Sequence, residues 1–179
     1  MKKTEIKIFL ASSSELELER AHVGDLFNDI NSNLADSEVR VRLLKWEMFD
    51  PAFKGVRKQA EYDRQVNKSD IFIALFRTKA GKYTIEEAEV AKNGHAQNEK
   101  PEELYCFFQD RQEKRELDED ELKSELGAGY IFDSFADIAG LKLKIIKILA
   151  PRLNADGVTV TETDKFIQIG NVNIIRKPE

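Results

Sequence analysis

Cysteine, histidine and glycine-rich motifs are scarce or missing in this sequence, and each shortage argues against a class of site. The single cysteine, Cys106, can form no disulfide within the chain, which fits a reducing, cytoplasmic location. His22 and His95 have no ligand spacing with each other or with Cys106, so we expect no metal site. Neither G-x-G-x-x-G nor G-x-x-x-x-G-K-S/T occurs, so the sequence predicts neither of these nucleotide cradles and no bound cofactor.

Long apolar runs and an excess of basic charge are missing as well. No stretch approaches the ~18 apolar residues that a membrane span needs, so we expect no membrane partner. The opening "MKKTEIKIFLASSS" has too short an apolar run for a secretion signal, and we expect a strand there. The net charge is −5, from 33 acidic and 28 basic residues, which argues against broad nucleic-acid binding.

Apolar runs do occur at regular intervals, and amphipathic stretches separate them. The pattern predicts strands over residues 5–11, 38–46, 70–76, 103–108 and 128–135. It predicts helices over residues 14–34, 56–68, 83–98 and 110–126, and one from 135 to about Pro151. This alternation indicates an α/β fold, a flavodoxin-like doubly wound sheet of five parallel strands. The run "DIFIALF" is almost wholly apolar, so we expect that strand to be covered on both faces.

The end of the chain has a different pattern. Residues 157–175 alternate apolar and polar side chains around a Gly-Asn pair, which predicts a β-hairpin. We expect an α/β domain over residues 1–152 and a β-rich tail, or the start of a truncated region, over 153–179. The hairpin could pack on the edge of that domain or pair with another chain.

The stretch "GKYTIEEAEVAKNG" (81–94) holds three closely spaced glutamates, Glu86, Glu87 and Glu89. On a helix with about 100° per residue, Glu87 falls on the small, apolar face, whereas Glu86 and Glu89 fall on the polar face. All three also lie in the first turns, where the helix dipole favours carboxylates. The pattern therefore leaves two interpretations open: a functional Glu87, or charges that only stabilise the helix.

The expected topology favours a site near Glu87. In a doubly wound sheet, ligands bind beyond the carboxyl ends of the strands, near the point where the strand order reverses. Ser12 and Ser13 follow the first strand, and Trp46 and Phe53 follow the second. Helix N-termini in this region favour phosphate oxygens, and aromatic faces can stack on a base.

Four segments in this order resemble a TIR (Toll/interleukin-1 receptor) domain, especially the bacterial branch found in defence proteins. They are "KIFLASSSELELER", "LLKWEMFDPAFKG", "YDRQVNKSDIFIALF" and "GKYTIEEAEVA", and the resemblance covers residues 5 to about 150. Many TIR proteins carry a W-C-x-x-E-L pattern with a catalytic glutamate. On this chain Tyr83 takes the tryptophan position, Thr84 the cysteine position and Glu87 the glutamate position, while Ala88 replaces the leucine.

The resemblance implies cleavage of NAD⁺ at the nicotinamide–ribose bond, in bacterial immunity, by a protein that self-associates. Glu87 would be the catalytic anion beside the ribose, and ADP-ribose or a cyclised form would be the product. The expected binding residues are Ser12 and Ser13 for the phosphates, Trp46 or Phe53 for a base, and Tyr83 for the ribose or nicotinamide.

Two alternatives stay open. Nucleoside deoxyribosyltransferases resemble this layout, also place a glutamate near a bound ribose, and are compatible with the start "IKIFLASS". TIR domains also serve as self-associating signalling modules without enzymatic activity, for which the helix at 110–126 and the tail could supply contact surfaces.

Overall fold

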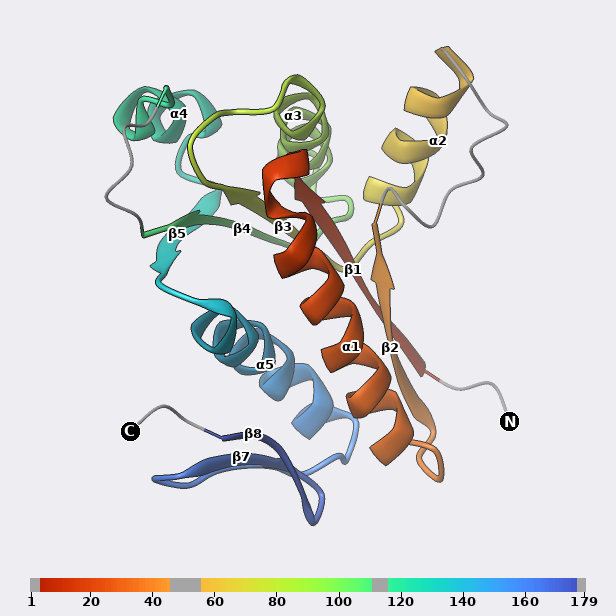
Figure 1. Cartoon of the computed structure of the whole chain (residues 1–179). Coiled ribbons are helices and arrows are strands. Elements are labelled where there is room, and N and C mark those ends of the chain that lie inside the picture. Colours follow the sequence, from red (N-terminus) through yellow and green to blue (C-terminus); the bar gives the residue numbers. More distant parts are fainter. Residues whose placement is uncertain (1–3, 46–55, 111–115, 177–179) are drawn as a thin grey trace. The chain divides into compact units, whose positions relative to one another are not determined.

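A five-stranded sheet with the order β2-β1-β3-β4-β5 organises the chain (Figure 1). The computed structural model describes residues 4–45, 56–110 and 116–176. The strands are β1 (Thr4–Ser12), β2 (Val39–Leu44), β3 (Ile71–Phe76), β4 (Glu103–Gln109) and β5 (Tyr130–Phe135). β3 pairs in parallel with both β1 and β4. The strand order reverses at β1, as in flavodoxin-like sheets, which confirms the fold class expected from the sequence.

The helices follow the strands in the expected alternation. They are α1 (Glu17–Asn33) after a short 3₁₀ turn at Ser14–Leu16, α2 (Val56–Val66), α3 (Lys82–Ala96), α4 (Glu119–Leu126) and α5 (Ile138–Ala155). The chain divides into two compact units. The sheet unit comprises residues 7–18 and 43–134, and the tail unit comprises residues 1–6, 19–42 and 135–179.

The sheet unit is built around β3, whose six residues are all fully buried. This confirms that the strand is covered on both faces. On one face Phe72 stacks on Phe9 of β1 with ring centroids 5.9 Å apart, and Phe76 stacks on Phe108 of β4 at the same distance. Aromatic pairs at this spacing add to the stabilisation that apolar burial provides.

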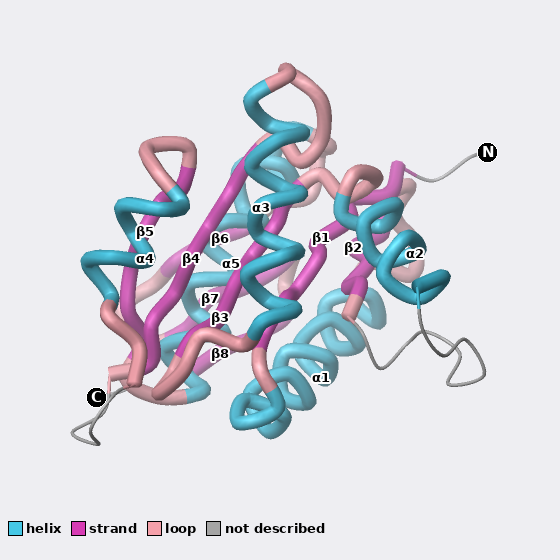
Figure 2. The backbone as a smooth tube through the Cα atoms, turned by 90° about the horizontal axis from the view of Figure 1, so that it is seen from above, coloured by secondary structure: helices cyan, strands magenta, loops and turns pink. Residues whose placement is uncertain are grey.

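Small residues allow α3 to lie close to β3 and β4 (Figure 2). Ala88 and Ala91 face the sheet and are fully buried. The hydroxyl of Tyr130 donates a 2.7 Å hydrogen bond to the carbonyl of Ala88. A Cβ on Gly94 would lie only 2.4 Å from the carbonyl oxygen of Lys100, so the glycine is required at this approach. These contacts fix the face that α3 turns to the sheet.

At the amino ends of the strands, Asp70 joins three segments of the sheet unit. Its carboxylate accepts a 2.7 Å hydrogen bond from the backbone N–H of Lys7 and forms an ion pair with the ammonium of Lys100. Its carbonyl accepts a 2.9 Å hydrogen bond from the N–H of Glu102. The starts of β1, β3 and β4 are therefore connected through one residue.

In the tail unit, the expected hairpin is a three-stranded antiparallel sheet. β6 (Val160–Glu162), β7 (Phe166–Ile169) and β8 (Val172–Arg176) lie in sequence order. Gly170, at the expected turn, has a φ of +60°, a conformation that glycine adopts without strain. The tail sheet contacts α5 of its own chain, and Lys147 of α5 forms a 3.3 Å ion pair with Glu162. The division expected after residue 152 stays a prediction, and α5 continues past it.

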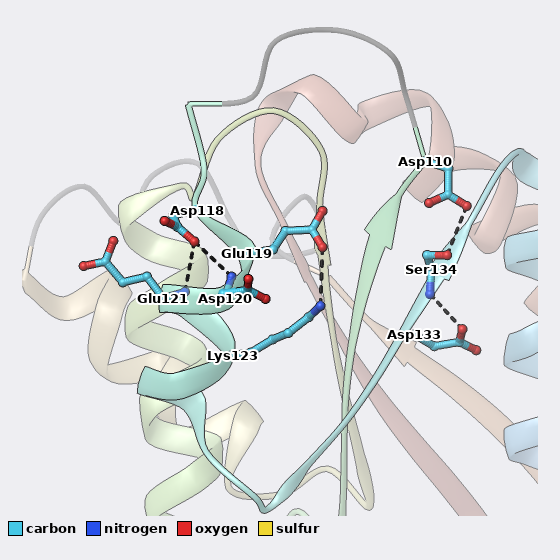
Figure 3. Close-up of polar contacts among 8 residues, drawn as sticks. All are labelled: Asp110, Asp118, Glu119, Asp120, Glu121, Lys123, Asp133 and Ser134. Atoms are coloured by element: carbon cyan, nitrogen blue, oxygen red, sulfur yellow. Dashed lines mark hydrogen bonds and ion pairs between the residues drawn. The ribbon is translucent and has the colours of Figure 1, made fainter.

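Two helix boundaries differ from the sequence prediction. α4 begins at Glu119 rather than near residue 110, because the Asp118 carboxylate accepts hydrogen bonds from the next turn's N–H groups and caps the helix there (Figure 3). α5 continues through Pro151 to Ala155, and Leu153 beyond the proline is fully buried. No helix in the described part of the chain is long and apolar enough to cross a membrane.

Candidate functional site

The loops that follow β1 and β3 meet at the carboxyl ends of these neighbouring strands. Gly81 is the N-cap of α3, and a Cβ placed there would lie 3.2 Å from the Cβ of Ser13. The same Cβ would lie 3.2 Å from the hydroxyl oxygen of Thr84, which is buried in the first turn of the helix. The start of α3 is therefore packed directly against the β1 loop, at the point where the strand order reverses.

Glu15 joins these two loops with its carboxylate. Its Oε1 accepts hydrogen bonds from the N–H of Thr78 at 3.1 Å, the N–H of Lys79 at 3.3 Å and the hydroxyl of Ser13 at 3.1 Å. Its Oε2 accepts a 2.6 Å hydrogen bond from the hydroxyl of Thr78. Burial alone would raise the pKa of Glu15, but the hydrogen bonds from Thr78, Lys79 and Ser13 outweigh it and lower the pKa.

Glu87 lies in the second turn of α3 and has the opposite kind of environment. It is only 6% exposed, and its carboxylate makes no hydrogen bond or ion pair with any residue that the structure describes. Burial, together with the charges of Asp63 on α2 and Glu86, raises the pKa of Glu87 from 4.5 to about 8. In this state of the protein, Glu87 is therefore mostly protonated at neutral pH.

The other two glutamates of the stretch face away from the sheet, as the helical periodicity predicted. Glu86 is partly exposed and forms a 3.7 Å ion pair with Lys82, one turn earlier. Glu89 is exposed. The interpretation in which all three are surface charges at a helix start therefore holds for Glu86 and Glu89 but does not hold for Glu87.

A buried carboxyl with this pKa can do two kinds of chemistry. Near neutral pH it can give or take a proton, as a general acid or base does. When a cation lies beside it, it ionises and stabilises that positive charge. The acidic neighbours Asp63 and Glu86 favour stabilisation of a positive charge over proton transfer, because they also attract a cation.

The structure brings together some of the other expected site residues and not all of them. Ser12 and Ser13 are 8% and 7% exposed and lie at the end of β1, but the Ser13 hydroxyl donates to Glu15. Tyr83 is 68% exposed at the start of α3. Trp46 and Phe53 lie outside the described residues.

The sequence prediction missed Glu15, Thr78 and Asp63. Glu15 and Thr78 are 63 positions apart, and no periodicity connects them. Asp63 lies on the polar helix α2, where its carboxylate resembles any other surface charge of the sequence. Among the described residues, no group of three or more histidine, cysteine, aspartate or glutamate side chains is arranged to hold a metal ion.

Comparisons with known proteins identify no family for this chain. No family model matches it, and no curated protein matches it. A solved structure of a CMP N-glycosidase from Clostridium botulinum has a TM-score of 0.49 and 14% identity, covering 80% of this chain and 99% of that one. The rubredoxin:oxygen oxidoreductase of Desulfovibrio gigas has a TM-score of 0.44 and 15% identity, covering 88% of this chain and 38% of that one. Likeness at this level carries no argument about function.

Proposed function

We propose that this protein cleaves an N-glycosidic bond of a nucleotide and that Glu87 is the carboxylate beside the ribose. The observation that carries this proposal is a carboxyl group buried without a hydrogen-bond or ion-pair partner among the described residues. Such burial costs free energy, and strongly perturbed acids are concentrated at functional sites. The helix that carries Glu87 also starts at the point where the strand order reverses, where folds of this class bind ligands.

The chemistry of the bond matches the electrostatics around Glu87. As an N-glycosidic bond breaks, positive charge develops on the ribose, as it does in glycoside hydrolysis. Asp63 and Glu86 both contribute negative charge near Glu87. A buried acidic group with acidic neighbours stabilises that developing charge more strongly than the same group does in water.

NAD⁺ is the substrate that the resemblance to TIR domains implies. In NAD⁺ the nicotinamide ring is a positively charged pyridinium bonded to the ribose. Because it departs as neutral nicotinamide, no general acid is needed. The positive ring would lower the pKa of Glu87 on binding, so that the carboxylate ionises when the substrate arrives. The raised pKa of Glu87 therefore supports a carboxyl group that is protonated before NAD⁺ binds and ionised once NAD⁺ is bound.

Base release from NAD⁺ and from deoxynucleosides, measured with concentrated protein, tests this proposal. We expect nicotinamide release from NAD⁺, and we expect Glu87→Ala to reduce it at least about a hundredfold with folding intact. Glu89→Ala is the matched control on the same helix and should change it little, whereas Glu86→Ala removes one of the two neighbouring charges and should reduce it by less than Glu87→Ala does. Equal losses of nicotinamide release in all three variants would count against the assignment of Glu87. Base release from deoxynucleosides alone would favour the deoxyribosyltransferase-like enzyme.

The exposed aromatic ring of Tyr83 favours a second candidate, a self-associating signalling module. Tyr83 is 68% exposed and lies one turn before Glu87, at the surface of α3. In this case the protein would assemble as its concentration rises, measured by sedimentation, and Tyr83→Ser would weaken assembly. Assembly without any base release from either substrate would favour this module over the enzyme.

A further inference from the structure

We propose that Glu15 is a positioning residue of the site: its carboxylate fixes the loop between β3 and α3 and thereby the place of Glu87. The inference rests on the proposed function, because it concerns the carboxylate that acts on the glycosidic bond. Glu15 itself would touch no substrate and would act only through the loop. Four hydrogen bonds to this one side chain, from Ser13, Thr78 and Lys79, carry the argument.

The loop that Glu15 holds is attached on a second side as well. The carbonyl of Thr78 accepts hydrogen bonds from the N–H of Glu116 at 2.8 Å and the N–H of Leu117 at 3.0 Å, just before α4. The side chain and N–H of the same residue are bonded to Glu15. Thr78 therefore connects the loops that follow β1, β3 and β4 through hydrogen bonds. Glu15 accepts two of these four hydrogen bonds of Thr78.

The restraint reaches Glu87 through the few residues between Thr78 and the start of α3. Gly81, the N-cap of α3, follows Thr78 closely in sequence and lies against the β1 loop, since a Cβ placed on it would be 3.2 Å from the Cβ of Ser13. The first hydrogen bond of the helix runs from the N–H of Ile85 to the carbonyl of Gly81 at 3.0 Å. Glu87 lies in the next turn, so a shift of the helix start moves it as part of a rigid helix. A misplacement of about 1 Å is enough to reduce catalysis by roughly a hundredfold.

The hydrogen-bond pattern at Glu15 makes a graded set of variants possible. Glu15→Ala removes all four acceptor bonds. Glu15→Gln keeps one acceptor oxygen for the two backbone N–H groups, and the Thr78 hydroxyl can rotate to accept from the new amide. Glu17→Ala is the matched control, because Glu17 is exposed at the start of α1, close to Glu15 in sequence.

Three measurements on these variants test the inference. We expect Glu15→Ala to lower kcat for nicotinamide release about ten- to a hundredfold with little change in KM, and Glu15→Gln to restore most of it. By ¹³C NMR, the pKa of Glu87 should fall in Glu15→Ala by at least about one unit from its value of about 8, because the shifted helix admits water. Amide exchange at Thr78 and Lys79 should become faster. Glu17→Ala should leave all three unchanged.

The readouts separate the two proposals. If the wild-type protein releases no base but the Glu87 pKa still moves in Glu15→Ala, the proposed function fails and the positioning role stands. If amide protection at Thr78 is lost while the Glu87 pKa and kcat stay unchanged, the positioning role is wrong. Should Glu15→Ala fail to fold, Thr78→Val removes only the 2.6 Å hydroxyl bond and should shift the Glu87 pKa in the same direction by less.

Discussion

Two acids of the sheet unit are almost fully buried, and the charges around them are opposite in sign. Asp70, at the amino ends of the strands, is 7% exposed and has the ammonium of Lys100 and the N–H of Lys7 as partners. Glu87, in the second turn of α3, is 6% exposed and has the negative charges of Asp63 and Glu86 nearby. Burial alone therefore does not distinguish the two acids; the charges around each of them do.

Glu15 shows a third arrangement in the same sheet unit. It has neutral donors rather than a cation, and these lower its pKa, whereas the pKa of Glu87 is raised. Hydrogen bonds to an ionised carboxylate stabilise its charged form. These environments fit the proposed roles, in which Asp70 stabilises the fold, Glu15 positions the start of α3 and Glu87 acts on the substrate.

The largest effect on stability is expected from Glu87→Gln, and it depends on pH. Between pH 4.5 and about 8 the folded protein binds more protons than the unfolded chain, because the pKa of Glu87 is raised on folding. The wild-type protein thus loses stability as pH rises through this interval, at about 1.4 kcal/mol per pKa unit. Glu87→Gln should be more stable than wild type by a few kcal/mol near pH 9 and equal to it near pH 4. Urea unfolding at both pH values measures this, and a variant less stable than wild type at pH 9 would show that Glu87 has a partner.

A smaller effect is expected where α3 meets the start of β4. Gly94→Ala places a Cβ 2.4 Å from the carbonyl oxygen of Lys100, so backbone must move. Overpacking of this kind costs about 1–3 kcal/mol. In Gly140→Ala, the nearest atom to the new Cβ is 3.4 Å away, so this matched change in α5 should be neutral or stabilising. Thermal unfolding compares the two variants, and equal stabilities would contradict a required glycine at this contact of α3 with Lys100.

The smallest effect tests the other half of the comparison. Asp70→Asn keeps an acceptor for the N–H of Lys7 but removes the ion pair with Lys100, whose side chain is 45% exposed. Because solvent screens this pair, we expect a loss of only about 1 kcal/mol at pH 8. The same acid-to-amide change should therefore destabilise at Asp70 and stabilise at Glu87. If both variants changed the free energy of unfolding in the same direction, the distinction between Asp70 and Glu87 would be wrong.

The fold could be predicted from the sequence because its signals are local. The wholly apolar run of β3 and the helical periodicity around Glu87 each lie within one segment, and the structure confirms both. Contacts between distant segments could not be predicted. The bonds from Thr78 to Glu15 depend on tertiary folding, and α5 continues through Pro151 because buried packing beyond it outweighs the lost hydrogen bond.

The pH dependence of kcat/KM for nicotinamide release from NAD⁺ tests the role of Glu87 most directly, because it reports the ionisation of the free enzyme. If the ionised carboxylate of Glu87 stabilises the ribose cation, kcat/KM should rise with pH and level off above the pKa of about 8. A kcat/KM that falls through this interval would mean that Glu87 works as an acid, and one that stays flat would mean that it takes no part. Either result would contradict the proposed role of Glu87.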